Sequence, residues 1–174
     1  APFKVVIAGE KHVGKTTLVH RFVHNQFPLK GLYSTILVDF NLKTVSINDK
    51  EISLAVFDFG GEAKFHEKFP QYAQGSEGLI LAFDPSRPET FNALEEWLNV
   101  YNKIDHSSIL FLISTKADLD ELKITEDEIL NFKDKNKFVE YYETSAVTGS
   151  NVERVFIEMA ERIIKKKQYE MNQI

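Results

Sequence analysis

Short apolar runs alternate along the chain with segments of helical periodicity. Residues 3–8, 54–57, 78–83 and 109–114 are almost entirely apolar, which is typical of strands buried on both faces of a mainly parallel sheet. Between and after these runs, apolar residues recur at spacings of three and four, as they do on the buried face of a helix. Such positions are Phe91, Leu94, Trp97, Leu98 and Tyr101 in one segment, and Val152, Val155, Phe156, Met159 and Ile163 in another. The alternation predicts an α/β fold.

Helix starts are indicated by three capping boxes, in which a hydroxyl residue precedes a glutamate by three positions. The pairs are Ser86 with Glu89, Thr125 with Glu128, and Ser150 with Glu153. In a capping box, the two side chains bond to backbone N–H groups that the first helical turn leaves free. Each pair therefore predicts that a helix begins beside it.

One stretch breaks the alternation of strands and helices. Two extended runs, residues 37–47 and 51–57, flank Asn48 and Asp49, and this pairing is expected at a tight hairpin turn. We therefore expect an antiparallel strand at the edge of the parallel sheet. No internal repeat or linker-like tract divides the 174 residues, so we expect one domain that spans residues 1–174.

Composition agrees with an ordinary folded domain and excludes several kinds of chemistry. The formal net charge is −5, which argues against binding to the phosphate backbone of nucleic acids. Cysteine is absent, so disulfides, thiolate zinc sites, thiol catalysis and a cysteine-linked lipid have no residue in this chain. No apolar stretch approaches the roughly 18 residues of a membrane span. We therefore expect a cytoplasmic protein.

The first apolar run leads directly into a glycine loop. Residues 9–16 read GEKHVGKT and fit the pattern GxxxxGK[ST], and residues 17–24 after them have helical character. Strand, glycine loop and helix occur in the order that a phosphate-binding P-loop requires. Backbone N–H groups of such a loop turn toward phosphate oxygens, and the helix N-terminus adds positive potential. The implied ligand is a nucleoside diphosphate or triphosphate.

Side chains of this loop can take defined roles. Lys15 reaches the terminal phosphates, and the Thr16 hydroxyl can ligate Mg²⁺. For His12, we expect a side chain that points to solvent and takes no part in acid–base chemistry. The candidate phosphate-binding residues are Glu10, Lys11, His12, Val13, Gly14, Lys15, Thr16 and Thr17.

A second motif selects the base. Thr115, Lys116 and Asp118 follow the apolar run at 109–114, at the carboxyl end of a predicted strand, where open α/β sheets bind ligands. The Asp118 carboxylate can accept hydrogen bonds from guanine N1–H and N2–H, whereas adenine offers no such pair of donors. We therefore expect guanine, since a P-loop ATPase or small-molecule kinase would need another base pocket.

These motifs resemble, in residue type and order, those of the Ras-like small GTPases, and residues 34–40, STILVDF, are most similar to the Rab branch. The resemblance covers nearly the whole chain. It implies a three-layer P-loop NTPase fold of the Ras-like G-domain type, with a central, mainly parallel six-stranded sheet, one antiparallel edge strand and helices on both faces. It also implies a GTP phosphohydrolase that acts as a molecular switch with GTP or GDP and Mg²⁺.

The resemblance assigns roles to the two switch segments. Thr35 would close over Mg²⁺ and the γ-phosphate, and Asp58 would hold Mg²⁺ through water. Gly61, the glycine of the DxxG element, would sense the γ-phosphate through its N–H group. Thr16, Thr35 and Asp58 are thus the predicted metal-binding residues.

The resemblance also assigns residues to the base. Phe27 would lie against the guanine edge, and Ser145, Ala146 and Val147 would form the last base-contacting loop, with Ala146 N–H meeting guanine O6. Two alternatives are open: Phe27 as a core residue at a helix end, and residues 145–146 as an ordinary loop.

Glu62 departs from the family pattern. It stands where most Ras-like enzymes carry the glutamine that orients the attacking water. A carboxylate can accept a proton from water but cannot donate a hydrogen bond as an amide does, and it adds negative charge beside the γ-phosphate. With Glu62, Lys15 and Gly61 as the predicted catalytic residues, we expect slow intrinsic hydrolysis with an altered pH dependence. Ordinary catalysis and near-inactivity are the alternatives.

Lys11 is a second departure, because the family usually has a small residue near the γ-phosphate at this position. Two interpretations are open. The lysine can offset developing charge and crowd out an arginine from an activating protein, or it can extend into water.

Further departures affect the base loops and switch II. Thr115 and Val147 replace the usual asparagine and lysine. Because a threonine hydroxyl is shorter than the asparagine amide that ties the base loop to the P-loop, weaker nucleotide binding is expected. The pair Gly60 and Gly61 predicts a loop that is disordered or ligand-dependent.

The sequence thus predicts a small GTPase that hydrolyses GTP slowly in intracellular or membrane-trafficking-type signalling. The alternative is a guanine-nucleotide-binding scaffold, a pseudo-GTPase with little or no hydrolysis. Expected partners are effectors, an exchange factor or an activating protein at the switch regions, where certain aromatic residues form either an effector surface or sheet packing. These residues are Phe40, Phe57, Phe65 and Tyr72. We expect a monomer without a nucleic-acid partner, peripheral to a membrane through a partner or through a tail outside this chain.

Overall fold

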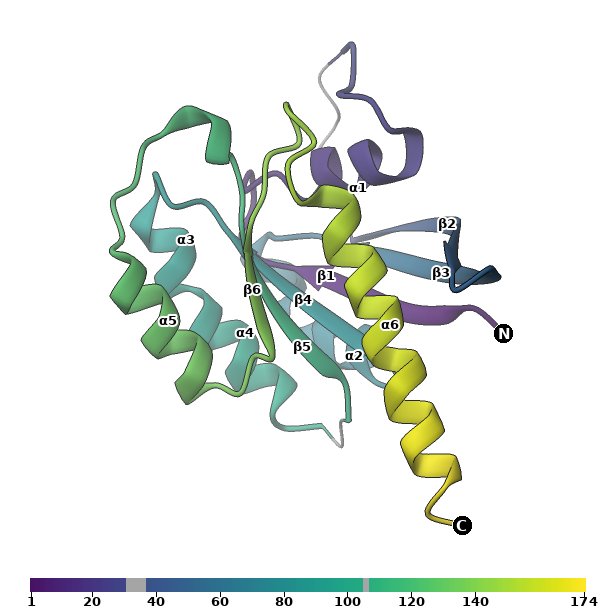
Figure 1. Cartoon of the computed structure of the whole chain (residues 1–174). Helices are drawn as coiled ribbons and strands as arrows, with labels where there is room; N and C mark the ends of the chain where they lie inside the picture. Colours follow the sequence, from purple (N-terminus) through teal and green to yellow (C-terminus); the bar gives the residue numbers. More distant parts are fainter. Residues whose placement is uncertain (31–36, 105–106) are drawn as a thin grey trace.

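The computed structural model describes residues 1–30, 37–104 and 107–174 (Figure 1). Its strands are β1 (Phe3–Ala8), β2 (Val38–Ile47), β3 (Lys50–Phe59), β4 (Gly78–Phe83), β5 (Ile109–Ser114) and β6 (Glu140–Glu143). They form one sheet in the order β2-β3-β1-β4-β5-β6, in which β2 pairs antiparallel with β3 and the other pairs are parallel. The predicted α/β fold, with its six-stranded sheet and antiparallel edge strand, is confirmed.

Helices cover both faces of this sheet (Figure 1). Helices α1 (Lys15–His24) and α6 (Val152–Met171) pack on one face, and α2 (Phe69–Ala73), α3 (Pro88–Asn92), α4 (Leu94–Tyr101) and α5 (Glu126–Lys135) lie on the other. Two 3₁₀ helices, η1 (Ala63–Lys68) and η2 (Ala117–Leu119), follow the strands β3 and β5. The three-layer arrangement is the one expected.

Alternating side chains of β1 contribute to two separate cores. Val5 and Ile7 belong to the cluster that α1 and α6 close, whereas Val6 and Ala8 belong to the cluster closed by α2, α4 and α5. Successive side chains of a strand point to opposite faces of the sheet. An uninterrupted apolar run can therefore fill both cores, as residues 5–8 do.

The strands β2 and β3 form the predicted hairpin. Ile47 pairs with Lys50 across Asn48 and Asp49, whose φ values of 50° and 64° are both left-handed. Two successive positive φ values are the mark of the type I′ turn, whose twist matches that of the strands. Strand β3 continues two residues beyond its predicted end and thereby brings Asp58 into the sheet.

Two predicted capping boxes are wrong. The Ser86 hydroxyl donates to the Asp84 carboxylate at 2.7 Å, and α3 begins after Arg87. Helix α6 begins after Asn151 rather than after Ser150, and no side chain caps it. In both places the helix starts one residue later than predicted, so the serine hydroxyl lies outside the capping position.

The third capping box, at the start of α5, is confirmed. Thr125 Oγ1 accepts a hydrogen bond from Glu128 N–H at 3.2 Å, and Glu128 Oε2 accepts one from Thr125 N–H at 3.1 Å. The two bonds satisfy donors at both ends of the first turn.

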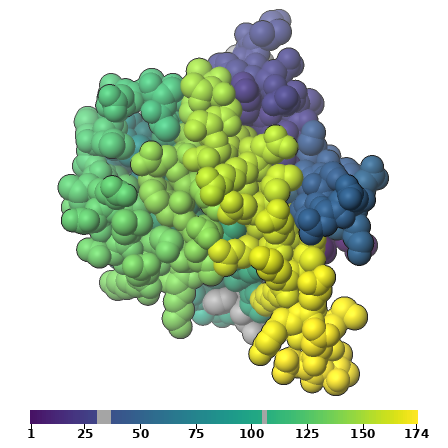
Figure 2. All heavy atoms as spheres, in the orientation of Figure 1, coloured from purple at the N-terminus to yellow at the C-terminus, as the bar shows by residue number. Residues whose placement is uncertain are grey.

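Helix α6 crosses the middle of one face of the molecule, and its last turns project beyond the other elements (Figure 2). Tyr169 and Met171 in these turns are largely exposed. In the three described stretches, no helix is both long and apolar enough to cross a membrane.

We expect Thr125→Ala to lower the free energy of unfolding by about 1 kcal/mol, because it removes the acceptor at the start of α5. Ser150→Ala is the matched control and should change it by less than about 0.5 kcal/mol, since the Ser150 hydroxyl makes no hydrogen bond to any other described residue. Urea denaturation measures both values. Equal losses in the two variants would contradict the assignment of the cap.

Candidate functional site

The glycine loop lies at the carboxyl end of β1, between β3 and β4. This is the point of an open α/β sheet at which the strand order reverses and ligands bind. Gly9 has a φ of 146°, and a Cβ atom at this position would overlap the carbonyl oxygen of Ala82 in β4. A glycine is therefore required where the chain leaves β1.

Lys15 is the first residue of α1 and is buried. Its Nζ donates to Glu10 O at 3.1 Å, so the side chain folds back over the loop. Burial lowers the pKa of Lys15, and the carboxylates of Asp58 and Glu10 oppose this effect. A phosphate group beside the ammonium would add negative charge and further stabilise its charged form.

Thr16 and Asp58, two predicted metal-binding residues, lie together. Thr16 Oγ1 donates to Asp58 Oδ2 at 2.5 Å, which joins α1 to β3, and Asp58 is almost fully buried. A hydroxyl and a carboxylate are the oxygen ligands that Mg²⁺ prefers, so these residues fit the metal. Thr35, the third predicted ligand, lies outside the described residues.

A pocket between α1 and the base loops brings together the residues predicted to contact guanine, apart from Ser145. Phe27, Lys116, Asp118, Ala146 and Val147 all line it. The side chain of Phe27 is 44% exposed, so it is not the core residue that the alternative supposed. The pocket also borders the P-loop, at which the phosphates would lie.

Ser145 joins the two base loops. Its hydroxyl donates to Asp118 Oδ1 at 2.8 Å and accepts from Thr148 N–H at 3.1 Å. The bond occupies one of the two carboxylate oxygens of Asp118 and fixes the orientation of the carboxylate. Residues 145–146 are therefore more than an ordinary loop before a helix.

Thr115 ties the end of β5 to the P-loop. Its buried hydroxyl donates to Val13 O at 2.6 Å and lies 3.2 Å from Phe83 O. The short side chain thus makes a connection between base loop and P-loop. The affinity for nucleotide stays a prediction.

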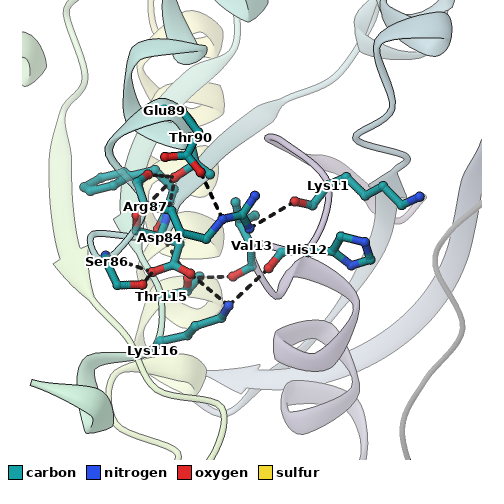
Figure 3. Close-up of polar contacts among 11 residues, drawn as sticks. Lys11, His12, Val13, Asp84, Ser86, Arg87, Glu89, Thr90, Thr115 and Lys116 are labelled. Carbon is teal, nitrogen blue, oxygen red and sulfur yellow. Dashed lines mark hydrogen bonds and ion pairs between the residues drawn. The ribbon is translucent and has the colours of Figure 1, made fainter. Parts of the chain in front are cut away.

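Asp84 organises the base loop, and the sequence reasoning missed it. Lys116 Nζ donates to Asp84 Oδ2 at 2.8 Å and to His12 O at 3.2 Å, and the N–H and hydroxyl of Ser86 donate to Oδ1 (Figure 3). Burial opposes ionisation, but the hydrogen bonds from Lys116 and Ser86 outweigh it, so the pKa of Asp84 lies below its ordinary value. The sequence feature that could have indicated Asp84 is its position, since it is the first polar residue after the apolar run at 78–83.

Switch II, the segment that begins at the DxxG element of residues 58–61, packs directly against the P-loop. Gly60 N–H donates to Leu37 O at 2.6 Å, and a Cβ atom on Gly61 would overlap the backbone nitrogen of Lys11. Gly61 is thus needed for close approach. The expectation that this loop is disordered or ligand-dependent stays a prediction.

Glu62 lies between two lysines. Its Oε1 is 3.1 Å from Lys11 Nζ, and its Oε2 is 3.2 Å from Lys64 Nζ. The hydrogen bond from Lys11, followed in size by that from Lys64, lowers the pKa of Glu62 from its ordinary value of 4.5. Lys11 therefore does not simply extend into water, whereas His12 beside it is exposed, as expected.

His66 and Arg87 also reach the P-loop, and sequence reasoning gave neither a role. The ring of His66 is buried against Trp97, with its nitrogens 3.3 Å from a Glu96 oxygen and 3.7 Å from a Glu10 oxygen. Arg87 Nη1 donates to the carbonyl of Lys11 at 3.4 Å (Figure 3). Both side chains come from segments far from the P-loop in the sequence, so no local pattern indicates them.

The sheet order, the glycine loop at its switch point and the two base loops define a P-loop nucleotide-binding domain of the Ras-like type. A family model described as the Ras family matches residues 4–165. The chain belongs to the Ras family, and it is a small GTPase, a GTP-binding switch that hydrolyses GTP.

Curated relatives give the same result. Ras-related protein Rab-18 of Lymnaea stagnalis is 35% identical over 93% of this chain and 80% of its own length. GTP-binding protein YPT1 of Saccharomyces cerevisiae is 34% identical over 92% and 78%, and human Ras-related protein Rab-30 is 34% identical over 94% and 81%. The similarity to the Rab branch is thus confirmed.

We expect Thr115→Val to lower the free energy of unfolding by about 1–3 kcal/mol, because it leaves the buried carbonyl of Val13 without its donor. Release of GDP should also become faster, since the base loop loses one of its connections to the P-loop and keeps that from Lys116 to His12 O. Thr115→Ser keeps the hydroxyl and is the control. Urea unfolding and the release of a fluorescent GDP analogue measure the two effects, and no change in the valine variant would contradict the role of this bond.

Proposed function

We propose that this small GTPase hydrolyses GTP slowly, and that the ion pairs of Glu62 set its intrinsic rate. The observation that carries the proposal is the position of Glu62 between Lys11 and Lys64. The comparisons give no support to the alternative of a scaffold without turnover.

Different residues of the site bind different parts of the nucleotide. Lys15 and the backbone N–H groups of the P-loop bind the phosphates, and Asp118 accepts hydrogen bonds from guanine. Thr16 and Asp58, whose oxygens are 2.5 Å apart, would hold Mg²⁺ together with Thr35, with Asp58 acting through water. When bound, the metal stabilises negative charge on the phosphate oxygens.

Glu62 affects the attacking water in two opposing ways. The carboxylate accepts a hydrogen bond from water but has no N–H to donate, unlike a glutamine. Lys11, at 3.1 Å, offsets the negative charge that Glu62 would otherwise bring toward the γ-phosphate. The ion pair therefore permits catalysis but does not orient the water as an amide would.

The remaining proposals concern partners and location. We propose a monomer, consisting of a single G domain over residues 1–174, that acts in trafficking-type signalling, binds no nucleic acid, and meets regulators and effectors at its switch regions. The exposed ring of Phe40, 5.2 Å from that of Phe57, supports an effector surface on the β2 edge. We place the protein in the cytoplasm, with membrane contact through a partner or a tail outside this chain.

We expect Glu62→Gln to accelerate single-turnover phosphate release by about tenfold, because the amide can orient water. The pKa of Glu62 lies below 4.5, so its ion pairs are formed above that pH and are lost as the pH falls through the lowered pKa. The ratio of the two rates should therefore stay constant from about pH 5 to 8 and change only in more acidic buffer. Identical rates at every pH would contradict the proposal, and absence of turnover in the parent protein would favour the scaffold.

We expect Lys11→Gly to slow intrinsic turnover by roughly three- to tenfold, because Glu62 then keeps an uncompensated charge beside the γ-phosphate. The loss should be much smaller in a Glu62→Gln background, where no such charge exists. Lys64→Gly is the comparison variant and should slow turnover less than Lys11→Gly, since Lys64 contacts Glu62 but does not belong to the P-loop. Turnover that is unaffected by Lys11→Gly in both backgrounds would contradict the coupling.

A further inference from the structure

Arg21 connects the helix that follows the P-loop to the loop that would contact guanine. It belongs to α1, whose first residues Lys15 and Thr16 face the phosphate end of the site. At 1.5 Å per residue, Arg21 lies about 9 Å farther along the same helix than Lys15. In Figure 1 the loop before α6 passes beside this part of α1.

The guanidinium group of Arg21 contacts two successive residues of that loop and lies over the space beside the third. Nη1 donates to Val147 O and Nη2 donates to Thr148 O, both at 3.4 Å. The next residue, Gly149, has a φ of 84°, and a Cβ atom there would lie 2.5 Å from Nη2 and 3.1 Å from Cζ. The glycine therefore allows both the turn and the close approach of the guanidinium.

The tip of this loop is held by bonds within the loop, such as Gly149 N–H to Ser145 O at 2.8 Å and Ser150 N–H to Thr148 Oγ1 at 3.2 Å, and by Arg21. Val147 is exposed, and its side chain adds nothing to the core. The bonds of Ser145 fix the beginning of the loop. Among the hydrogen bonds of the described residues, those from Arg21 are the ones that join the carbonyls of Val147 and Thr148 to another element.

We infer that Arg21 is a positioning residue for guanine recognition. This inference rests on the proposed function of the pocket as the guanine site. Arg21 Nη2 holds the peptide between Thr148 and Gly149, and the N–H of that peptide donates to Ser145 O at 2.8 Å. Because Ser145 O and Ala146 N–H belong to one peptide group, Arg21 fixes through this bond the orientation in which Ala146 N–H would face guanine O6. The arginine fork suits this role because it donates to two carbonyls at once, whereas a lysine is a point charge. Arg21 thus sets the geometry of the contact to O6 and does not touch the nucleotide.

The test uses analogues that differ at one edge of the base. In 6-thio-GDP a sulfur, which is a weak acceptor, replaces O6, while N1–H and N2–H remain for Asp118. Inosine diphosphate keeps O6 but lacks the 2-amino group. The first analogue therefore reports on the loop that Arg21 holds, and the second reports on Asp118.

Arg21→Met, which keeps the aliphatic part of the side chain, should release GDP about fivefold faster. Its preference for GDP over 6-thio-GDP should fall by about threefold, while its preference for GDP over inosine diphosphate stays the same. Arg21→Lys should give a smaller loss and serves as the second variant where the methionine variant is unstable. Arg154→Met, which removes an arginine of α6 paired with Glu158, is the control and should leave all three values unchanged.

The outcomes separate this inference from the function on which it rests. If the parent protein does not prefer GDP to inosine diphosphate, the assignment of the guanine pocket fails. The other case is a parent protein that does prefer GDP. If Arg21→Met then weakens the binding of GDP and of 6-thio-GDP equally, or weakens the binding of neither, Arg21 has no positioning role and only this inference fails.

Discussion

The hydrogen bond from Thr115 Oγ1 to Val13 O joins the two parts on which the site is built, the P-loop after β1 and the base loop after β5. Other contacts end on the same short stretch of backbone. Lys116 reaches His12 O, Arg87 reaches Lys11 O, and switch II packs against the nitrogen of Lys11. The carbonyls of the P-loop thus face neighbouring loops, because each must find a donor once it is removed from water.

Charge in the site is arranged locally, whereas the chain as a whole carries a net charge of −5. Glu62 and Asp84 each lie against a lysine, and their pKa values are lowered accordingly. Lys15 is buried beside Asp58, so the cation that meets phosphate is already partly compensated. Bound phosphate and Mg²⁺ would change the charge around Asp58, at the end of β3. The same strand pairs along its whole length with β2, which carries the exposed Phe40.

Much of the fold follows from local patterns, and the errors have local causes. The apolar runs, the hairpin at Asn48 and Asp49, and the cap at Thr125 were predictable, since each depends on neighbours in sequence. Strand β6, with the sequence EYYE, was not recognised because only Tyr142 of its four residues is buried. The serine caps failed because the helices begin one residue later, and a capping motif does not fix a boundary by itself.

The sequence by itself determined the family, the phosphate loop and the residue that would select guanine, because these depend on residue types at fixed spacing within single loops. Tertiary structure alone decided that Thr115 spans the gap to Val13, that Asp84 orients Lys116, and that Lys11 pairs with Glu62. It also decided that Arg21 lies over Gly149. These contacts join residues separated by 32 to 128 positions, so they exist only once the strands of the sheet have brought their carboxyl ends together.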